Sequence, residues 1–377
     1  MNYYSFCSFL PGATTTQLIC LLAYRKGGIK LVLPSMLIWI SPAFIIATLL
    51  AVILLRSEII SSTHRLFFFF KPMVVSFMIY ASVKAKTFYS KSIKDLRPIV
   101  LNVLLIIIFF KHPFIIPILF IINALYAHYM FSGFHHISLI KVFRRFTINY
   151  HILILYITLF LSFGFLSEYS RKYETKNRYF FNLIEHNFRF GSVVYGGGDV
   201  LIPLMYEQYI SRPSARITQK RNPDALSLKK DELITAAGVI RLMPGPVFVL
   251  TAFTAPYLLK DFDVAQKILG SVFSTISLFL PGILILLILA PFWYTLYHNK
   301  TFSNIVSGIN LTVFSIMLAS SIYMSADLLF IDSLNGYESI IHLIMIITLL
   351  LLMFFTKLNH TSIALICLSL GLIFHFL

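Results

Sequence analysis

The sequence predicts an all-α integral membrane protein with about 12 transmembrane segments in an inverted repeat of Pro-Gly-broken helices. The first observation is composition: 58% of the residues are hydrophobic and 12% are charged, whereas a soluble domain carries roughly 25% charged residues. The second is that apolar stretches recur along the whole chain. The third is that Pro-Gly motifs at 11–12 and 244–245 interrupt two of these stretches. Such a break leaves backbone N–H and C=O groups unpaired, so protein or a watery cavity must cover it.

Several of the expected spans are shorter than the roughly 20 helical residues that cross a bilayer. The pairs 98–130 and 340–377 are expected to form tight hairpins that turn at 111–113 and 359–361. The expected spans are 3–24, 31–55, 66–83, 98–110, 114–130, 149–167, 178–204, 233–258, 267–297, 303–326, 340–356 and 361–377.

Loop charge predicts the orientation, because cytoplasmic loops carry an excess of lysine and arginine. If all the spans cross the bilayer, most basic residues fall in the loops on one side, which is therefore expected to be cytoplasmic in a multi-pass protein of the plasma (inner) membrane. The loop at 168–177, with Arg171, Lys172 and Lys176, opposes this bias. The loops expected in the cytoplasm are 25–30, 84–97, 131–148, 205–232, 298–302 and 357–360.

The order of the spans predicts two copies of one unit. The two Pro-Gly breaks lie on the first and eighth expected spans, an odd separation, so the copies are expected to run in opposite directions. Residues 1–130 form the expected first repeat, 131–177 a basic linker with an extra crossing, and 178–377 the second repeat. The span with three consecutive glycines leads the second copy. The first copy is expected to lack its leading span, because the chain starts at Met1 almost on its break.

These motifs resemble the chromate ion transporter family, in which each repeat carries a Phe-Gly-Gly segment followed by a Pro-Gly-Pro segment. The order and spacing of the motifs carry the resemblance over nearly the whole chain. It departs from the family pattern at Ala13, Tyr195 and Arg241. The matching motifs are Phe6-Cys7-Ser8-Phe9-Leu10-Pro11-Gly12 with Gln17, Lys71-Pro72-Met73-Val74-Val75, Tyr195-Gly196-Gly197-Gly198 with Pro203-Leu204-Met205, and Gly238-Val239-Ile240-Arg241-Leu242-Met243-Pro244-Gly245-Pro246-Val247-Phe248.

The resemblance implies a secondary transporter of a tetrahedral oxyanion, chromate or else sulfate, that works by efflux and is not an enzyme. Its partners would be the anion and the lipid bilayer, and a homodimer is a possible assembly. Three alternatives stay open. They are a carrier for another inorganic or organic anion, an inactive truncated paralogue, and an integral-membrane enzyme acting on a lipid-linked substrate. The last would need clustered Asp, His or Arg side chains at the membrane face, and no such cluster is visible.

The expected substrate site lies where the broken helices meet. Arg241 precedes the second break by about one helical turn, where a guanidinium suits an oxyanion; alternatively it extends toward the nearby loop. The three glycines expose N–H groups that bind anions, or else allow close helix packing. The hydroxyls after the first break donate to substrate or bond to their own helix. The candidate substrate-binding residues are Pro11, Gly12, Thr15, Gln17, Gly196, Gly197, Gly198, Arg241, Pro244, Gly245 and Pro246.

Other polar residues inside the spans have two interpretations each. Asp199 either carries a coupling proton or caps the half-helix that follows the glycines. Glu185 and Arg189, spaced i and i+4, are expected to form a structural ion pair. Histidine and cysteine spacing supports no metal site, no cofactor is expected, and the basic residues lie in short loops rather than in a nucleic-acid-binding surface.

Overall fold

We describe the protein from a computed structural model. It describes residues 3–8, 10–56, 65–89, 97–109, 115–132, 149–194, 198–214, 216–222, 224–292, 300–326, 328–329 and 336–376. Throughout these ranges every regular element is helical, which confirms the all-α prediction.

Five helices are long and apolar enough to cross a membrane. Their outward faces carry large exposed apolar side chains such as Ile38 on α3 and Leu161 on α9, as expected of helices solvated by lipid. The chain is therefore a multi-pass membrane protein. The five are α3 (Ile29–Arg56), α9 (Tyr150–Lys172), α15 (Val264–Leu289), residues Ser307–Ala326 of α17 (Lys300–Ala326) and α18 (Gly336–Phe355).

Four further helices complete the frame around them. The expected pair at 98–130 corresponds to α6 and α7, and the expected pair at 340–377 corresponds to α18 and α19. Buried amides connect the α6–α7 pair to α17, because Asn102 donates to Asn123 (3.2 Å) and Asn123 donates to Thr312 (3.0 Å). The four are α5 (Phe70–Tyr89), α6 (Arg97–Ile108), α7 (Ile115–Ser132) and α19 (His360–Phe376).

The segment with the first Pro-Gly motif folds back on itself. Helix α1 (Tyr3–Ser8) runs into the break, and α2 (Thr14–Gly27) runs out of it. The Arg25 guanidinium at the end of α2 lies 4.7 Å from the ring centroid of Tyr3 at the start of α1, and it donates a hydrogen bond to the Tyr3 hydroxyl. The two ends of this segment are therefore neighbours, and we call α1 and α2 the first hairpin.

The glycine-rich segment forms a second hairpin. Its first arm is α10 (Arg178–Val193), and its second arm combines a 3₁₀ turn (η1, Gly198–Val200), α11 (Leu201–Tyr206) and a π-helix (η2, Glu207–Ser211). Side chains join the arms along their length, because the Tyr209 ring lies 6.1 Å from that of Phe190 and 5.5 Å from that of His186.

The second Pro-Gly motif forms the third hairpin. Helix α13 (Lys230–Leu242) enters the break, and η3 (Val247–Val249) with α14 (Leu250–Leu258) returns from it. The arms pack against each other. Glu232 in the first turn of α13 interacts electrostatically with Lys260, just beyond α14. An arm of 13 residues is about 20 Å long, too short to cross a bilayer of about 30 Å.

The prediction that the broken segments 3–24, 178–204 and 233–258 each cross the membrane is therefore wrong. Arg178 pairs with Asp224 at 2.8 Å, and Lys71 pairs with Asp231 at 2.8 Å. The twelve-span assignment places Arg178 and Asp224 on opposite faces of the bilayer, roughly 30 Å apart, and it places Lys71 inside a span while Asp231 lies in a cytoplasmic loop. A glycine or proline break lets the chain turn back as readily as continue, so apolar length alone could not separate the two outcomes.

The orientation argument changes with the topology. Because the Arg178–Asp224 pair joins the ends of the loops at 168–177 and 205–232, these two basic loops lie at the same end of the molecule. The excess of lysine and arginine placed 205–232 in the cytoplasm and 168–177 on the other side of the membrane. This assignment to opposite sides therefore no longer holds.

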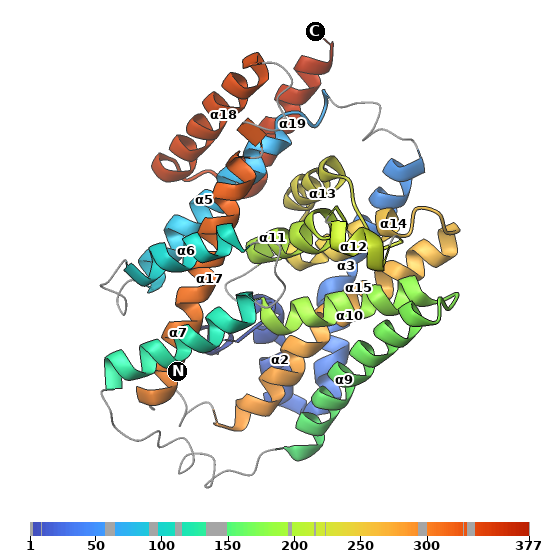
Figure 1. Cartoon of the computed structure of the whole chain (residues 1–377), viewed down its shortest axis with the longest axis vertical. Helices are drawn as coiled ribbons and strands as arrows, with labels where there is room; N and C mark the ends of the chain where they lie inside the picture. Colours follow the sequence, from blue (N-terminus) through green and yellow to red (C-terminus); the bar gives the residue numbers. More distant parts are fainter. Residues whose placement is uncertain are drawn as a thin grey trace.

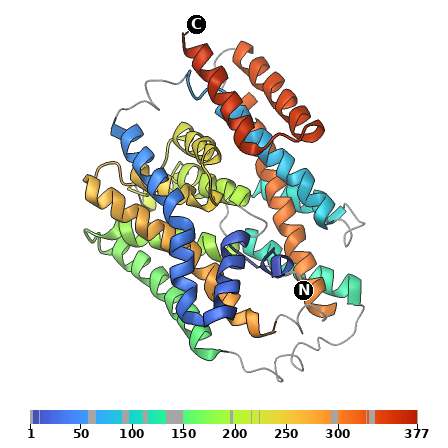
Figure 2. The same ribbon diagram turned by 180° about the vertical axis from the view of Figure 1, so that it is seen from behind.

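The returning arm of the second hairpin and the third hairpin lie near the middle of the molecule. In Figure 1, α11 and α13 lie between a lower group with α2, α9 and α10 and an upper group with α18 and α19, and α17 runs past them from the upper to the lower part. Figure 2, from behind, shows α2 and α3 in blue beside the orange α15. One hydrophobic core includes side chains from all three hairpins and from the long helices around them.

Cysteine cross-linking tests the turn-back of the second hairpin. We expect a short bis-maleimide to join Arg178→Cys to Asp224→Cys, because the native side chains bridge the gap between the two backbones and meet at 2.8 Å. The three native cysteines are buried and give little background. Gel mobility, with each single variant as the control, measures the cross-link. Failure to cross-link under conditions that join a Lys71→Cys, Asp231→Cys pair would contradict the hairpin.

Candidate functional site

The first break is held by backbone contacts to the second hairpin and to α15. Gly12 adopts φ +118°, a conformation that favours glycine. Its N–H donates to the Val194 carbonyl at 2.7 Å. A side chain on Gly282 of α15 would place its Cβ 2.9 Å from the Pro11 carbonyl oxygen. The break therefore rests on two other elements rather than on lipid.

Gln17 satisfies the carbonyls that this break exposes. Its amide Nε2 donates to the Pro11 carbonyl at 2.7 Å and to the Gly282 carbonyl at 3.0 Å. Within the described residues, the Gln17 Oε1 and the Thr16 hydroxyl are buried without a hydrogen-bond partner. Two buried polar atoms of this kind indicate that water or a ligand completes the site. Thr15, a predicted contact, is exposed instead.

The second break touches α3 and the end of the glycine triplet. Gly245 adopts φ +140°, and a Cβ there would lie 2.6 Å from that of Ala43 on α3. Val247, after the break, lies so close to Gly198 that a Cβ on Gly198 would be 2.5 Å from it. Gly196 and Gly197 lie outside the described residues, as does the Asp199 side chain.

The three breaks therefore converge. Val194 lies two residues before the glycine triplet and Gly198 is its last residue, and each is contacted by a different Pro-Gly break. The contacts are also reciprocal, since the first break packs on α15 and the second on α3, each the long helix that follows the other break. Glycine at these positions lets backbone approach backbone, which brings the N–H groups of interrupted helices into one region.

Arg241 lies on α13 one turn before the second break. Its side chain is 7% exposed, and the guanidinium carbon lies 4.5 Å from the ring centroid of Phe77 on α5. It also donates to the Ala237 carbonyl of the preceding turn at 3.2 Å. The aromatic face and the backbone oxygen stabilise a buried cation between two helices.

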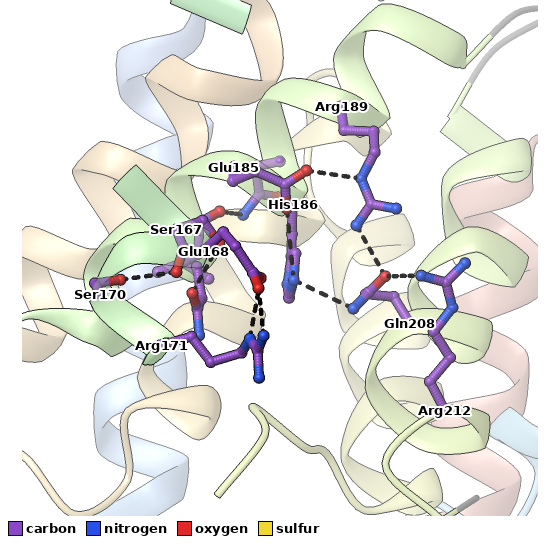
Figure 3. Close-up of polar contacts among 12 residues, drawn as sticks. Ser167, Glu168, Ser170, Arg171, Glu185, His186, Arg189, Gln208 and Arg212 are labelled. Carbon is purple, nitrogen blue, oxygen red and sulfur yellow. Dashed lines mark hydrogen bonds and ion pairs between the residues drawn. The ribbon is translucent and has the colours of Figure 1, made fainter. Parts of the chain in front are cut away.

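A second polar group lies between the arms of the second hairpin (Figure 3). The Arg189 Nε lies 3.0 Å from the Glu185 Oε1, in the ion pair that the i, i+4 spacing predicts. Gln208 and Arg212 were not predicted as members, because residues 205–232 were expected to form a loop, and His186, inside the expected span 178–204, was not predicted either. Gln208 accepts from Arg189 at 2.9 Å and from Arg212 at 3.0 Å, and its Nε2 lies 3.2 Å from the His186 Nε2.

This polar group borders a cavity of about 360 Å³ between α9, the second hairpin and residues 213–226. Its lining includes Arg171, which donates to Glu168 at 3.0 Å. Sequence spacing contained a partial signal, since Arg212 follows Gln208 by four positions, as Arg189 follows Glu185. The hairpin that brings Gln208 and Arg212 next to Glu185 and Arg189 is not marked by any local sequence pattern.

Comparison with known proteins identifies the family. The sequence model of a family described as chromate transporter matches residues 1–128 and 181–374. The chain belongs to the chromate transporter family. One relative is an uncharacterized transporter of Methanocaldococcus jannaschii, 25% identical over 324 residues, which cover 85% of this chain and 73% of the relative. No solved structure matches the chain.

Each of the two regions that match the chromate transporter family contains one Pro-Gly break and the long helix that packs on the other break. Residues 11–12 and α3 lie in the first region, and 244–245 and α15 lie in the second. The convergence of the breaks therefore joins the two halves of a membrane transporter.

Proposed function

We propose that the chain is a secondary transporter that moves a tetrahedral oxyanion, chromate or sulfate, out of the cell across the plasma membrane. Membership of the chromate transporter family supports transport of a small inorganic ion. One observation carries the rest: two Pro-Gly breaks contact opposite ends of the glycine triplet. Interrupted helices whose ends meet in this way form the midplane sites of many secondary transporters.

The substrate would bind at this convergence. Backbone N–H groups at the breaks and at Gly196, Gly197 and Gly198 would donate to the oxyanion, since N–H groups in such concave segments attract anions. Gly12, Gly245 and their neighbours Pro11, Pro244 and Pro246 would shape the backbone, and Gln17 and Arg241 would border the site. Helix α2, whose first turn follows the first break, adds the positive end of its dipole.

We also propose that the two halves form an inverted repeat, with 1–130 and 178–377 as the copies and 131–177 as the linker and extra crossing. Between the first hairpin and the second lie α3, α5, α6, α7 and α9. Five crossings are an odd number, and the parity stays odd if the short pair α6–α7 only dips into the bilayer. The hairpins would then enter from opposite faces, which the reciprocal contacts of the breaks support.

Alternating access would follow if the hairpins tilt against the long helices and expose the convergence to one face at a time. An ion gradient or a counter-anion would drive the cycle. Asp199, in η1 beside the triplet, would either carry a coupling proton or cap the returning arm.

Transport by the Arg241→Gln variant tests the site. We expect its KM for chromate in reconstituted vesicles to rise by about 10- to 100-fold, since a hydrogen bond to a charged group is worth about 1.5–3 kcal/mol. Arg178→Gln, which removes a charge at the entrance of the second hairpin, should leave KM unchanged. Equal KM values for Arg241→Gln and the wild type would remove Arg241 from the site, and the absence of oxyanion transport by the wild type would refute the function.

A further inference from the structure

Two arginines of the second hairpin converge on a single neutral oxygen atom. Arg189 Nη2 on α10 donates to the Gln208 Oε1 at 2.9 Å, and Arg212 Nη1 after η2 donates to the same oxygen at 3.0 Å. The two residues come from different arms of the hairpin, and Figure 3 shows both side chains pointing toward Gln208. Like charges held this close repel each other, and the repulsion grows as the surroundings become less polar.

An amide oxygen only partly offsets that repulsion. Glu185 pairs with the Arg189 Nε and Glu207 with the Arg212 Nε. Each guanidinium has five N–H donors in a fixed plane. Within the described residues, Arg212 uses two of them on these partners, and Arg189 uses one, on Gln208, while its Nε lies in the ion pair with Glu185. The bonds to the amide are already charge-assisted on the donor side, and an oxyanion would add the Coulomb attraction of a full negative charge, which the neutral amide oxygen lacks. An anion at the position of the Gln208 oxygen would therefore be better held than the amide is.

The surroundings provide room and further donors. The adjoining cavity, of about 360 Å³, is also lined by the neutral polar side chains Ser167, Asn182, Thr218 and Asn222. Its size falls at the lower end of the range for small-molecule sites, about 300–1,000 Å³. Glu168 is neutralised by Arg171, which donates to it. The cavity is thus polar and spacious, with Arg189 and Arg212 beside Glu185 on one side.

A π-helical turn positions the group. Residues Glu207–Ser211 form a π-helix, a rare conformation that occurs frequently at functional sites. Gln208 lies within this turn and Arg212 directly follows it. The Gln208 amide nitrogen lies 3.2 Å from the His186 Nε2, a contact that directs its oxygen toward the arginines.

We propose that this cavity binds a small divalent oxyanion, with Arg189 and Arg212 as its charged ligands and with the Gln208 oxygen marking the position of one anion oxygen. On binding, the anion displaces the Gln208 amide. The site is distinct from the convergence of the breaks, and it lies between that region and the hairpin entrance where Arg178 meets Asp224. It rests on the proposed function only in making the occupant the transported ion.

Protection of a cysteine in the cavity measures binding without transport. Thr218→Cys places a thiol in the lining, and the native cysteines Cys7, Cys20 and Cys367 are buried. We expect sulfate to slow the reaction of this thiol with N-ethylmaleimide severalfold in the purified protein, whereas chloride at the same ionic strength does not. No difference between the two salts would overturn the proposal.

Two substitutions at one position separate anion binding from a structural role. Gln208→Glu places a tethered carboxylate between the arginines, so the sulfate concentration that gives half-protection should rise at least tenfold. Gln208→Ala removes the displaceable oxygen and should protect at the same sulfate concentration as the native side chain, or a lower one. Equal protection in both variants would overturn the proposal, as would loss of protection in the alanine variant while it remains monodisperse.

The same assay distinguishes this site from the transport site. In an Arg241→Gln background, sulfate protection should be unchanged even where the KM for transport rises. Protection that disappears together with Arg241 would place the anion at the breaks and overturn the second site. Protection in a protein that transports no oxyanion would support the second site and refute only the proposed function.

Discussion

Replacing Gln17 by leucine is expected to lower the free energy of unfolding by about 1–3 kcal/mol. The Gln17 amide is the donor to the Pro11 and Gly282 carbonyls in the protein core. The Gly282 carbonyl lies within α15 and keeps its intrahelical partner, whereas the Pro11 carbonyl at the break would lose its donor, at a cost of about 1–3 kcal/mol. Leucine keeps the volume but has no donor, so the first break would lose its connection to α15. Thermal unfolding in detergent, monitored by tryptophan fluorescence or by a cysteine-reactive dye, measures the change.

The exposed neighbour Thr15 offers a matched control. Thr15→Val should alter the stability by no more than about 0.5 kcal/mol, because surface substitutions remote from special features have small effects. If Gln17→Leu and Thr15→Val unfold at the same temperature, the Gln17 amide does not hold the break.

Replacing Gly191 by alanine is expected to disrupt the packing of α10 on α15. The new Cβ would lie 2.0 Å from the Leu278 carbonyl oxygen and 2.7 Å from the Pro281 Cγ of α15. The oxygen belongs to the backbone of a long helix and cannot rotate away. Overpacking a core costs about 1–3 kcal/mol where side chains can adjust, so a clash with backbone should separate α10 from α15. We expect loss of monodisperse protein on size-exclusion chromatography.

Gly164 provides the comparison within the same bundle. It lies on α9, with open space around its Cβ position. Gly164→Ala should be neutral or stabilise the protein by up to about 1 kcal/mol, because alanine favours a helix over glycine. Equal yields of folded protein from the Gly191 and Gly164 variants would contradict the close approach of α10 and α15.

Local sequence patterns predicted the helical segments well. Apolar runs marked α3, α15 and α17, and Pro-Gly motifs marked both breaks, because a positive φ and a missing N–H are properties of single residues. The i, i+4 spacing of Glu185 and Arg189 likewise predicted the geometry of their ion pair, since it depends on one helix alone.

The course of the chain after each break could not be predicted in this way. An arm that turns back has the same apolar composition as one that continues, so the segments at 178–204 and 233–258 were expected to cross. The polar group around Gln208 was missed for the same reason. Arg189 and Gln208 are 19 positions apart and meet only because the hairpin folds.

The hairpins also affect how this architecture tolerates change. A segment that enters and leaves at the same end contributes no net passage through the bilayer. Gaining or losing a whole hairpin therefore leaves every downstream helix in its original orientation across the membrane. Losing one spanning helix would instead reverse the orientation of all downstream helices. Pro-Gly hairpins of this kind are modular parts, and relatives with different numbers of them can keep the same set of long helices in the same orientation.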